Sequence, residues 1–110
     1  MYVKVVPYIN LPQDIKIQEF TYEILDSISS DVKIGTIVFV LFRNRKVEGY
    51  ISYIYKKTPK LDKKINTIIN IYNKYLITDL QIEIINFVSE NFFVNKSKAF
   101  KTVIPKLPRR

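Results

Sequence analysis

The sequence contains no cysteine and no histidine, and only two of its 110 residues are glycine. Without these side chains the chain has no disulfide, no thiolate or imidazole catalyst and none of the commonest zinc ligands. Two glycines are also too few for the usual glycine-rich loops that bind phosphate groups. The 10 acidic residues are scattered along the chain. We therefore expect a protein with no catalytic residue, no metal and no cofactor.

Long apolar runs are missing as well. No stretch approaches the roughly 18 apolar residues that cross a bilayer, and the N-terminus lacks a signal pattern. We expect a cytoplasmic protein with no membrane partner. The hydrophobic content of 47% is that of a folding chain. Its length is that of one domain, which we place at residues 1–105, with residues 106–110 as the start of a linker or the cut end of a longer chain.

Basic residues dominate the charged side chains. There are 18 Lys and Arg against 10 Asp and Glu, which gives a net charge of +8. Residues 31–64 and residues 96–110 each carry a net charge of +6, whereas the two other segments each carry −2. Two basic blocks on a slightly acidic body favour a polyanionic partner, with nucleic acid as the first choice.

Residues of β-forming type occur in five segments. Short polar, glycine-containing or proline-containing stretches separate most of them, and Arg43 to Lys46 reads as a basic loop between two strands of a hairpin. Gly49 lies inside a strand, which indicates a bulge or a close backbone approach. For the fifth segment a helix is the competing interpretation. The predicted strands are Tyr2–Tyr8, Phe20–Ile24, Thr36–Phe42, Val47–Tyr55 and Ile65–Tyr72.

A helix is predicted to begin at Thr78, because Gln81 follows three residues later in a capping-box arrangement. Residues at helical spacing are expected to form the face that packs this helix on the sheet: Leu80, Ile84, Phe87, Val88 and Asn91. Phe92 and Phe93 are expected in the core, and a second short helix can run from Ser97 to Val103. The fold class is therefore α+β, a small curved antiparallel sheet or partly open, OB-like β-barrel with one main C-terminal helix.

Several motifs, in order, resemble one family. Phe20-Thr21-Tyr22 corresponds to a Phe-Asp-Tyr triplet, and the basic segment from Arg43 to Tyr50 corresponds to a loop closed by glycine. The aromatic pair Phe92-Phe93 and the later Pro105 match the family's helix end. Together they resemble the N-terminal, 3′-end DNA-binding domain of PriA (primosomal protein N′), the replication-restart helicase.

The resemblance implies a domain that recognises stalled forks and holds the 3′ end of the nascent leading strand. Phe20 and Thr21 then line the pocket for the terminal nucleotide, and Lys64, or Lys63 one residue earlier, meets the backbone or sugar. Thr21 replaces the family's aspartate, and Arg43 takes a loop position that is usually glycine. The expected DNA contacts are Phe20, Thr21, Arg43, Arg45, Lys46, Lys63 and Lys64.

The same resemblance implies DNA as partner, forked or single-stranded and with a 3′ end. It also implies the helicase domains of full-length relatives and other primosome proteins as partners. The chain itself lacks helicase motifs and is expected to be no enzyme. Two alternatives remain: an RNA-binding or ribosome-associated small β-barrel, and a non-enzymatic protein-interaction domain whose basic surface binds acidic tails.

Overall fold

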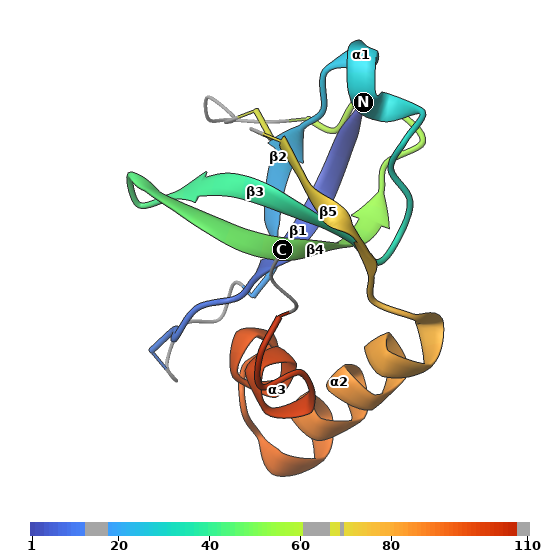
Figure 1. Cartoon of the computed structure of the whole chain (residues 1–110). Coiled ribbons are helices and arrows are strands. Elements are labelled where there is room, and N and C mark those ends of the chain that lie inside the picture. Colours follow the sequence, from blue (N-terminus) through green and yellow to red (C-terminus); the bar gives the residue numbers. More distant parts are fainter. Residues whose placement is uncertain (13–17, 61–66, 69, 108–110) are drawn as a thin grey trace.

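A five-stranded antiparallel sheet lies beside two C-terminal helices, and the helices cover one end of it (Figure 1). The computed structural model describes residues 1–12, 18–60, 67–68 and 70–107. A short helix, α1, spans Asp26–Ser29. The remaining elements are the strands β1 (Tyr2–Pro7), β2 (Phe20–Glu23), β3 (Thr36–Phe42), β4 (Arg45–Ile54) and β5 (Asn70–Leu76), and the helices α2 (Asp79–Phe92) and α3 (Lys96–Val103).

The strand order is β2-β1-β4-β3-β5, so the ten-residue strand β4 lies in the middle. The two edges of the sheet approach each other, because the N–H of Ile68, just before β5, donates to the Glu23 carbonyl at the end of β2 (2.8 Å). A sheet that curls until its edges meet at one end is a partly open barrel. The predicted fold class is confirmed.

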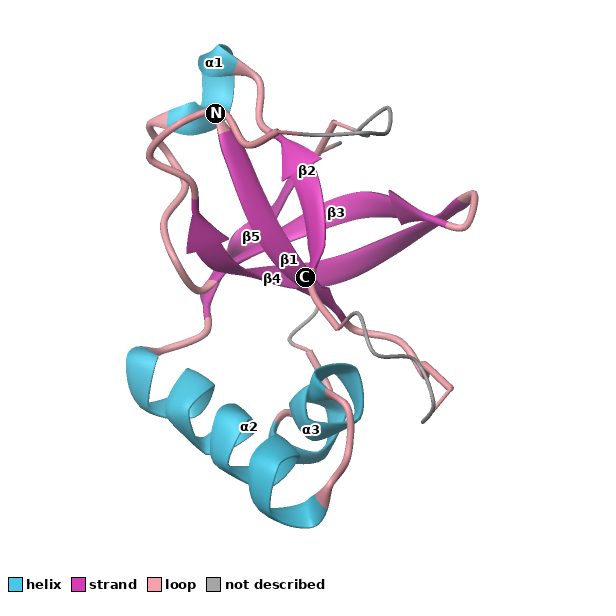
Figure 2. Cartoon of the chain, turned by 180° about the vertical axis from the view of Figure 1, so that it is seen from behind, coloured by secondary structure: helices cyan, strands magenta, loops and turns pink. Residues whose placement is uncertain are grey.

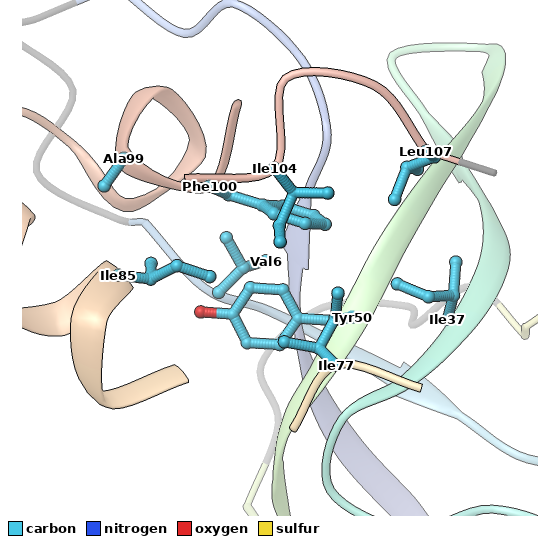
Figure 3. Close-up of a cluster of buried hydrophobic side chains, with 9 residues drawn as sticks. All are labelled: Val6, Ile37, Tyr50, Ile77, Ile85, Ala99, Phe100, Ile104 and Leu107. Carbon is cyan, nitrogen blue, oxygen red and sulfur yellow. The ribbon is translucent and has the colours of Figure 1, made fainter. Parts of the chain in front are cut away.

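One core lies between the sheet and the helices (Figure 3). The Tyr50 ring of β4 meets the Phe100 ring of α3 edge to face, with centroids 4.8 Å apart. Both side chains are fully buried, and such aromatic pairs stabilise beyond their buried area. The buried members are Val6, Ile37, Tyr50, Ile77, Ile85, Ala99, Phe100, Ile104 and Leu107. Packing therefore continues through Leu107, beyond residue 105.

A second core fills the inside of the curl. Side chains alternate between the two faces of a strand, so Val5 of β1 points into this core while Val6 points toward the helices. Tyr22 of β2 is buried here, as predicted, and its hydroxyl donates to the Leu41 carbonyl (3.0 Å). Burial raises the pKa of Tyr22 to about 12, which keeps this donor protonated.

The structure confirms the predicted strands near the N-terminus, and Thr36–Phe42 has the predicted bounds. For the fifth segment the strand interpretation is confirmed over the competing helix, but β5 begins only at Asn70. Residues 61–66 and 69 lie outside the described residues. The α2 capping box is present: the Gln81 N–H donates to Thr78 Oγ1 (3.1 Å) and the Thr78 N–H to Gln81 Oε1 (2.9 Å).

The predicted packing face of α2 is right at Val88 and wrong at Leu80, Ile84 and Phe87. Leu80 is 65% exposed and Phe87 60% exposed, whereas Ile85 is fully buried with Ile82 and Val88 beside it. Apolar residues occur on more than one side of this helix, so helical spacing alone does not choose between two stripes. The contact with α3 selects the stripe that contains Ile85.

The expected burial of Phe92 and Phe93 is wrong too. The two side chains are 67% and 83% exposed. Phe93 is the C-terminal cap of α2 and adopts the left-handed conformation (φ 55°), which turns the chain toward α3. The turn itself, rather than the aromatic side chains, joins the two helices.

Gly49 allows β1 and β4 to approach each other closely. A Cβ atom at this position would lie 2.5 Å from Val5 Cγ1 and 2.9 Å from the Val6 carbonyl oxygen. The predicted close approach is confirmed.

We expect Gly49→Ala to destabilise the fold by about 1–3 kcal/mol through overpacking, measured by urea unfolding. Glu48→Ala at the neighbouring, half-buried position is the control, and equal stabilities of the two variants would contradict this account.

Candidate nucleic-acid interface

The β3–β4 hairpin ends in a cationic tip that projects beyond the rest of the sheet (Figure 2). Its two-residue loop is Arg43-Asn44, and both residues have positive φ (51° and 64°). The loop predicted from Arg43 to Lys46 is therefore too long, because Arg45 and Lys46 already belong to β4. Two-residue hairpin loops adopt such angles because the resulting twist matches that of the strands. The tight loop leaves Arg43, Arg45 and Lys46 exposed around the tip.

A hollow of about 460 Å³ lies where β1 separates from β4. The last bond between them is the Tyr8 N–H donating to the Glu48 carbonyl (2.8 Å), and beyond it the chain turns away. We call this cavity the basic hollow. Its lining residues are Tyr8, Ile9, Asn10, Phe42, Arg43, Arg45, Lys46, Val47, Glu48 and Lys101.

The two basic blocks of the sequence meet in the basic hollow. Arg43, Arg45 and Lys46 come from the first block, and Lys101 of α3 comes from the second. Among the described residues that line the hollow, Glu48 is the only acidic one. A second hollow of about 440 Å³ shares Asn10 and Lys101 and adds Lys98 to the surface. Cations from the middle and from the C-terminal part of the sequence thus face one concave region, which suits a polyanion.

Aromatic rings lie next to these cations. Lys46 Nζ is 4.4 Å from the Phe39 ring centroid, and Lys101 Nζ is 5.2 Å from that of Tyr8. Arg43 Cζ is 5.2 Å from the Phe42 ring centroid. Contacts between cations and ring faces orient the charged groups while leaving their N–H donors free for phosphate oxygens.

The Tyr8 side chain is anchored rather than free to titrate. Its hydroxyl donates to the Ile104 carbonyl (2.6 Å), and its ring meets Phe100 edge to face. Burial, and then the charge of Glu48, raises the pKa of Tyr8. Tyr8 therefore adds an uncharged ring to the lining of the basic hollow, and this ring is fixed to the helix core.

Comparison with known families supplies the decisive observation: the model of the PriA 3′ DNA-binding domain family matches residues 8–105. The chain belongs to this family. It is a DNA-binding domain of the replication-restart primosome and not a catalytic one. No curated protein sequence matches it. The resemblance seen in the sequence is confirmed.

Among the described residues of this PriA 3′ DNA-binding domain, no cluster of three acidic, cysteine or histidine side chains is placed to hold a metal ion. In the same part of the chain, no helix has both the length and the apolar character needed to cross a bilayer.

Phe20 lies behind the wall of the basic hollow. Its half-buried ring meets Phe42 edge to face, with centroids 4.8 Å apart, and Phe42 lines the hollow. Phe20 therefore supports the aromatic wall from the side of the inner core. Its predicted role as a contact for the terminal nucleotide stays a prediction.

Thr21 lies on the opposite face of β2 from Phe20 and Tyr22, because successive side chains of a strand alternate. Its partner in the ladder is Lys4 of β1. The structure thus brings Arg43, Arg45 and Lys46 together and separates Thr21 from them. Lys63 and Lys64 lie outside the described residues, and their role stays a prediction.

Sequence reasoning missed Tyr8 and Asn10 as parts of the interface. The sequence predicts that Tyr8 ends a strand, and it gives Asn10 no role in binding. Their position at the hollow depends on where β1 stops pairing with β4 and on the contact of Tyr8 with α3. No local signal in the sequence carries that information.

Arg43 adopts a left-handed backbone conformation that glycine favours, and its side chain adds a charge there. Its φ of 51° lies in the left-handed region, where an L-residue costs roughly 1–2 kcal/mol more than glycine. We expect Arg43→Gly to fold at least as stably in urea, since this gain is only partly offset by backbone entropy. The variant should bind single-stranded DNA with a log–log salt slope shallower by about 0.7, as one phosphate contact is lost.

Asn44→Gly is the matched control for this prediction, because it changes the same turn (φ 64°) without removing a charge. Its salt slope should equal that of the unmodified domain in fluorescence anisotropy. An unchanged slope in Arg43→Gly would contradict a phosphate contact by Arg43.

Proposed function

We propose that this domain recognises stalled replication forks by binding the 3′ end of the nascent leading strand. The family membership supports this, since the family is that of the 3′ DNA-binding domain. The observation that carries the proposal is the convergence of both basic blocks on the basic hollow. Electrostatic attraction by this region first captures the DNA backbone, and the strand end is then seated near Thr21.

The protein partners follow from the same proposal. The domain serves a replication-restart helicase in the cytoplasm, and the ATP-driven helicase domains and other primosome proteins act on the fork that it marks. Its own contribution is to bind and position DNA. Capture depends on Arg43, Arg45, Lys46 and Lys101, because these cations face one concave region.

The number of cations sets the salt dependence of binding. If Arg43, Arg45, Lys46 and Lys101 each neutralise one phosphate of single-stranded DNA, the log–log salt slope is roughly −3. Affinity should then fall on the order of 50-fold between 50 and 200 mM salt. Fluorescence anisotropy with a labelled oligonucleotide measures this. A slope near zero would show that the hollow does not bind phosphates.

End recognition is tested with three ligands: a fork with a 3′-hydroxyl, the same fork with a 3′-phosphate, and an RNA hairpin. The fork with the free hydroxyl should bind most tightly. Equal binding of the two forks would exclude end recognition, and tightest binding of the RNA would favour the RNA-binding alternative. A protein-interaction domain would bind none of them at 100 mM salt.

Thr21 offers a gain-of-function variant. Thr21→Asp restores the carboxylate of the family's triplet, and charge-assisted hydrogen bonds are roughly twice as strong as neutral ones. We expect its preference for the 3′-hydroxyl over the 3′-phosphate to rise about fivefold or more, in the same anisotropy assay. Thr21→Asn is the control, because asparagine has the shape of aspartate without its charge. Its preference for the 3′-hydroxyl should rise less. A preference unchanged by Thr21→Asp would remove Thr21 from the end-binding site.

A further inference from the structure

A second aromatic and cationic surface lies at the far end of β4 from the hairpin tip. Tyr53 is 47% exposed, and its ring meets that of Tyr55 edge to face, with centroids 5.1 Å apart. Lys4 Nζ is 5.7 Å from the Tyr53 ring centroid and 6.0 Å from that of Tyr55. We call these three side chains the tyrosine platform. None of them is among the residues expected from the sequence to contact DNA.

A β-bulge creates this platform. Val5 pairs with Ile51, but the neighbouring Lys4 pairs with Tyr53, so Ser52 is an extra residue in β4. In a regular strand Tyr53 would share the buried face of Ile51; the bulge reverses the alternation and turns Tyr53 outward. The Ser52 hydroxyl donates to the Lys4 carbonyl (3.3 Å), which holds the bulge in place.

The platform continues across the sheet. Lys4 pairs with Thr21 on one side and with Tyr53 on the other, so Thr21, Lys4 and Tyr53 form a row over β2, β1 and β4. Two exposed lysines, Lys56 and Lys57, follow Tyr55 directly. A row of hydroxyl, ammonium and aromatic groups across strands suits a nucleic-acid strand that crosses the sheet, with bases on the rings and phosphates at the lysines.

The platform is distinct from the basic hollow. Along β4, Tyr53 is eight residues (about 26 Å) from Arg45 and five residues (about 16 Å) from Glu48, which is the nearest residue of this strand in the lining of the hollow. Between them, Tyr50 is buried under Phe100 of α3. One nucleotide cannot touch both places, so a strand bound at the platform presents different nucleotides from those held at the hollow.

We propose that the tyrosine platform is a base-stacking site for single-stranded DNA, with Tyr53 as the ring on which a base stacks. Lys4 orients the two rings and meets the adjacent phosphate. The site reads no particular base, because every base has a stacking face. This inference rests on the proposed DNA-binding function and adds bases to the phosphate contacts of the basic hollow.

A tryptophan reporter tests the stacking directly, since the chain has no tryptophan of its own. Tyr53→Trp should show quenched fluorescence when a 12-nucleotide oligothymidine is added. The same length of abasic sugar-phosphate should leave the fluorescence unchanged. Phe87→Trp, at a more exposed aromatic position on α2 (60% against 47% for Tyr53), is the control and should not respond. Equal responses of the two tryptophans, or quenching by the abasic strand, would overturn the proposal.

Affinity measurements give the second readout. Tyr53→Ala should bind the 12-nucleotide strand about fivefold or more weakly, the lower end of what one stacked base contributes. Its salt slope should stay unchanged, because no phosphate contact is removed. Tyr53→Phe keeps a ring and should bind normally. Full affinity of Tyr53→Ala would refute the platform.

The two proposals fail in distinguishable ways. Failure of the unmodified domain to bind the oligonucleotide would refute DNA binding and the platform together. Normal binding with a slope of about −3, combined with an unaffected Tyr53→Ala, would refute the platform alone. Lys101→Ala tests the hollow separately from the platform. It should make the salt slope shallower by about 0.7 and leave the fluorescence quenching of Tyr53→Trp unchanged.

Discussion

The pairing of β1 with β4 joins strands β2 and β1 to strands β4, β3 and β5 in one sheet. β4 is the central strand, and β1 can approach it closely because Gly49 has no side chain to meet Val5 and Val6. Where this pairing ends, beyond Tyr8, the basic hollow opens. Where it shifts register, at Ser52, Tyr53 turns outward. Both surfaces that we assign to DNA are therefore consequences of one strand pair.

The helices contribute to binding through the core that they close. Phe100 and Ile104 are buried against the sheet, which fixes α3 and carries Lys101 to the Tyr8 ring. A basic block at the end of the sequence thereby joins one from the middle. Binding of this kind needs cations, rings and hydroxyls but no titrating catalyst, which agrees with a chain that lacks histidine and cysteine.

Local sequence signals predicted the elements well and their packing poorly. The β-branched run Thr36–Phe42 and the Thr78–Gln81 capping box depend on neighbouring residues, and both were predicted correctly. The packing face of α2 was not, because Leu80 and Ile85 are equally suitable for burial until α3 is in place. The family could also be recognised from the sequence, because its motifs occur in the same order along this chain.

The sequence by itself determined the first three strands, the start of α2, the basic character and the family, and it placed β4 and β5 only approximately. These properties follow from residue type and short-range spacing. Only the tertiary structure decided that Lys101 joins Arg43, Arg45 and Lys46, that Phe20 and Thr21 point to opposite faces, and that Tyr53 is exposed. Such relations arise from strand order, a one-residue bulge and helix docking, which bring together residues far apart in the chain.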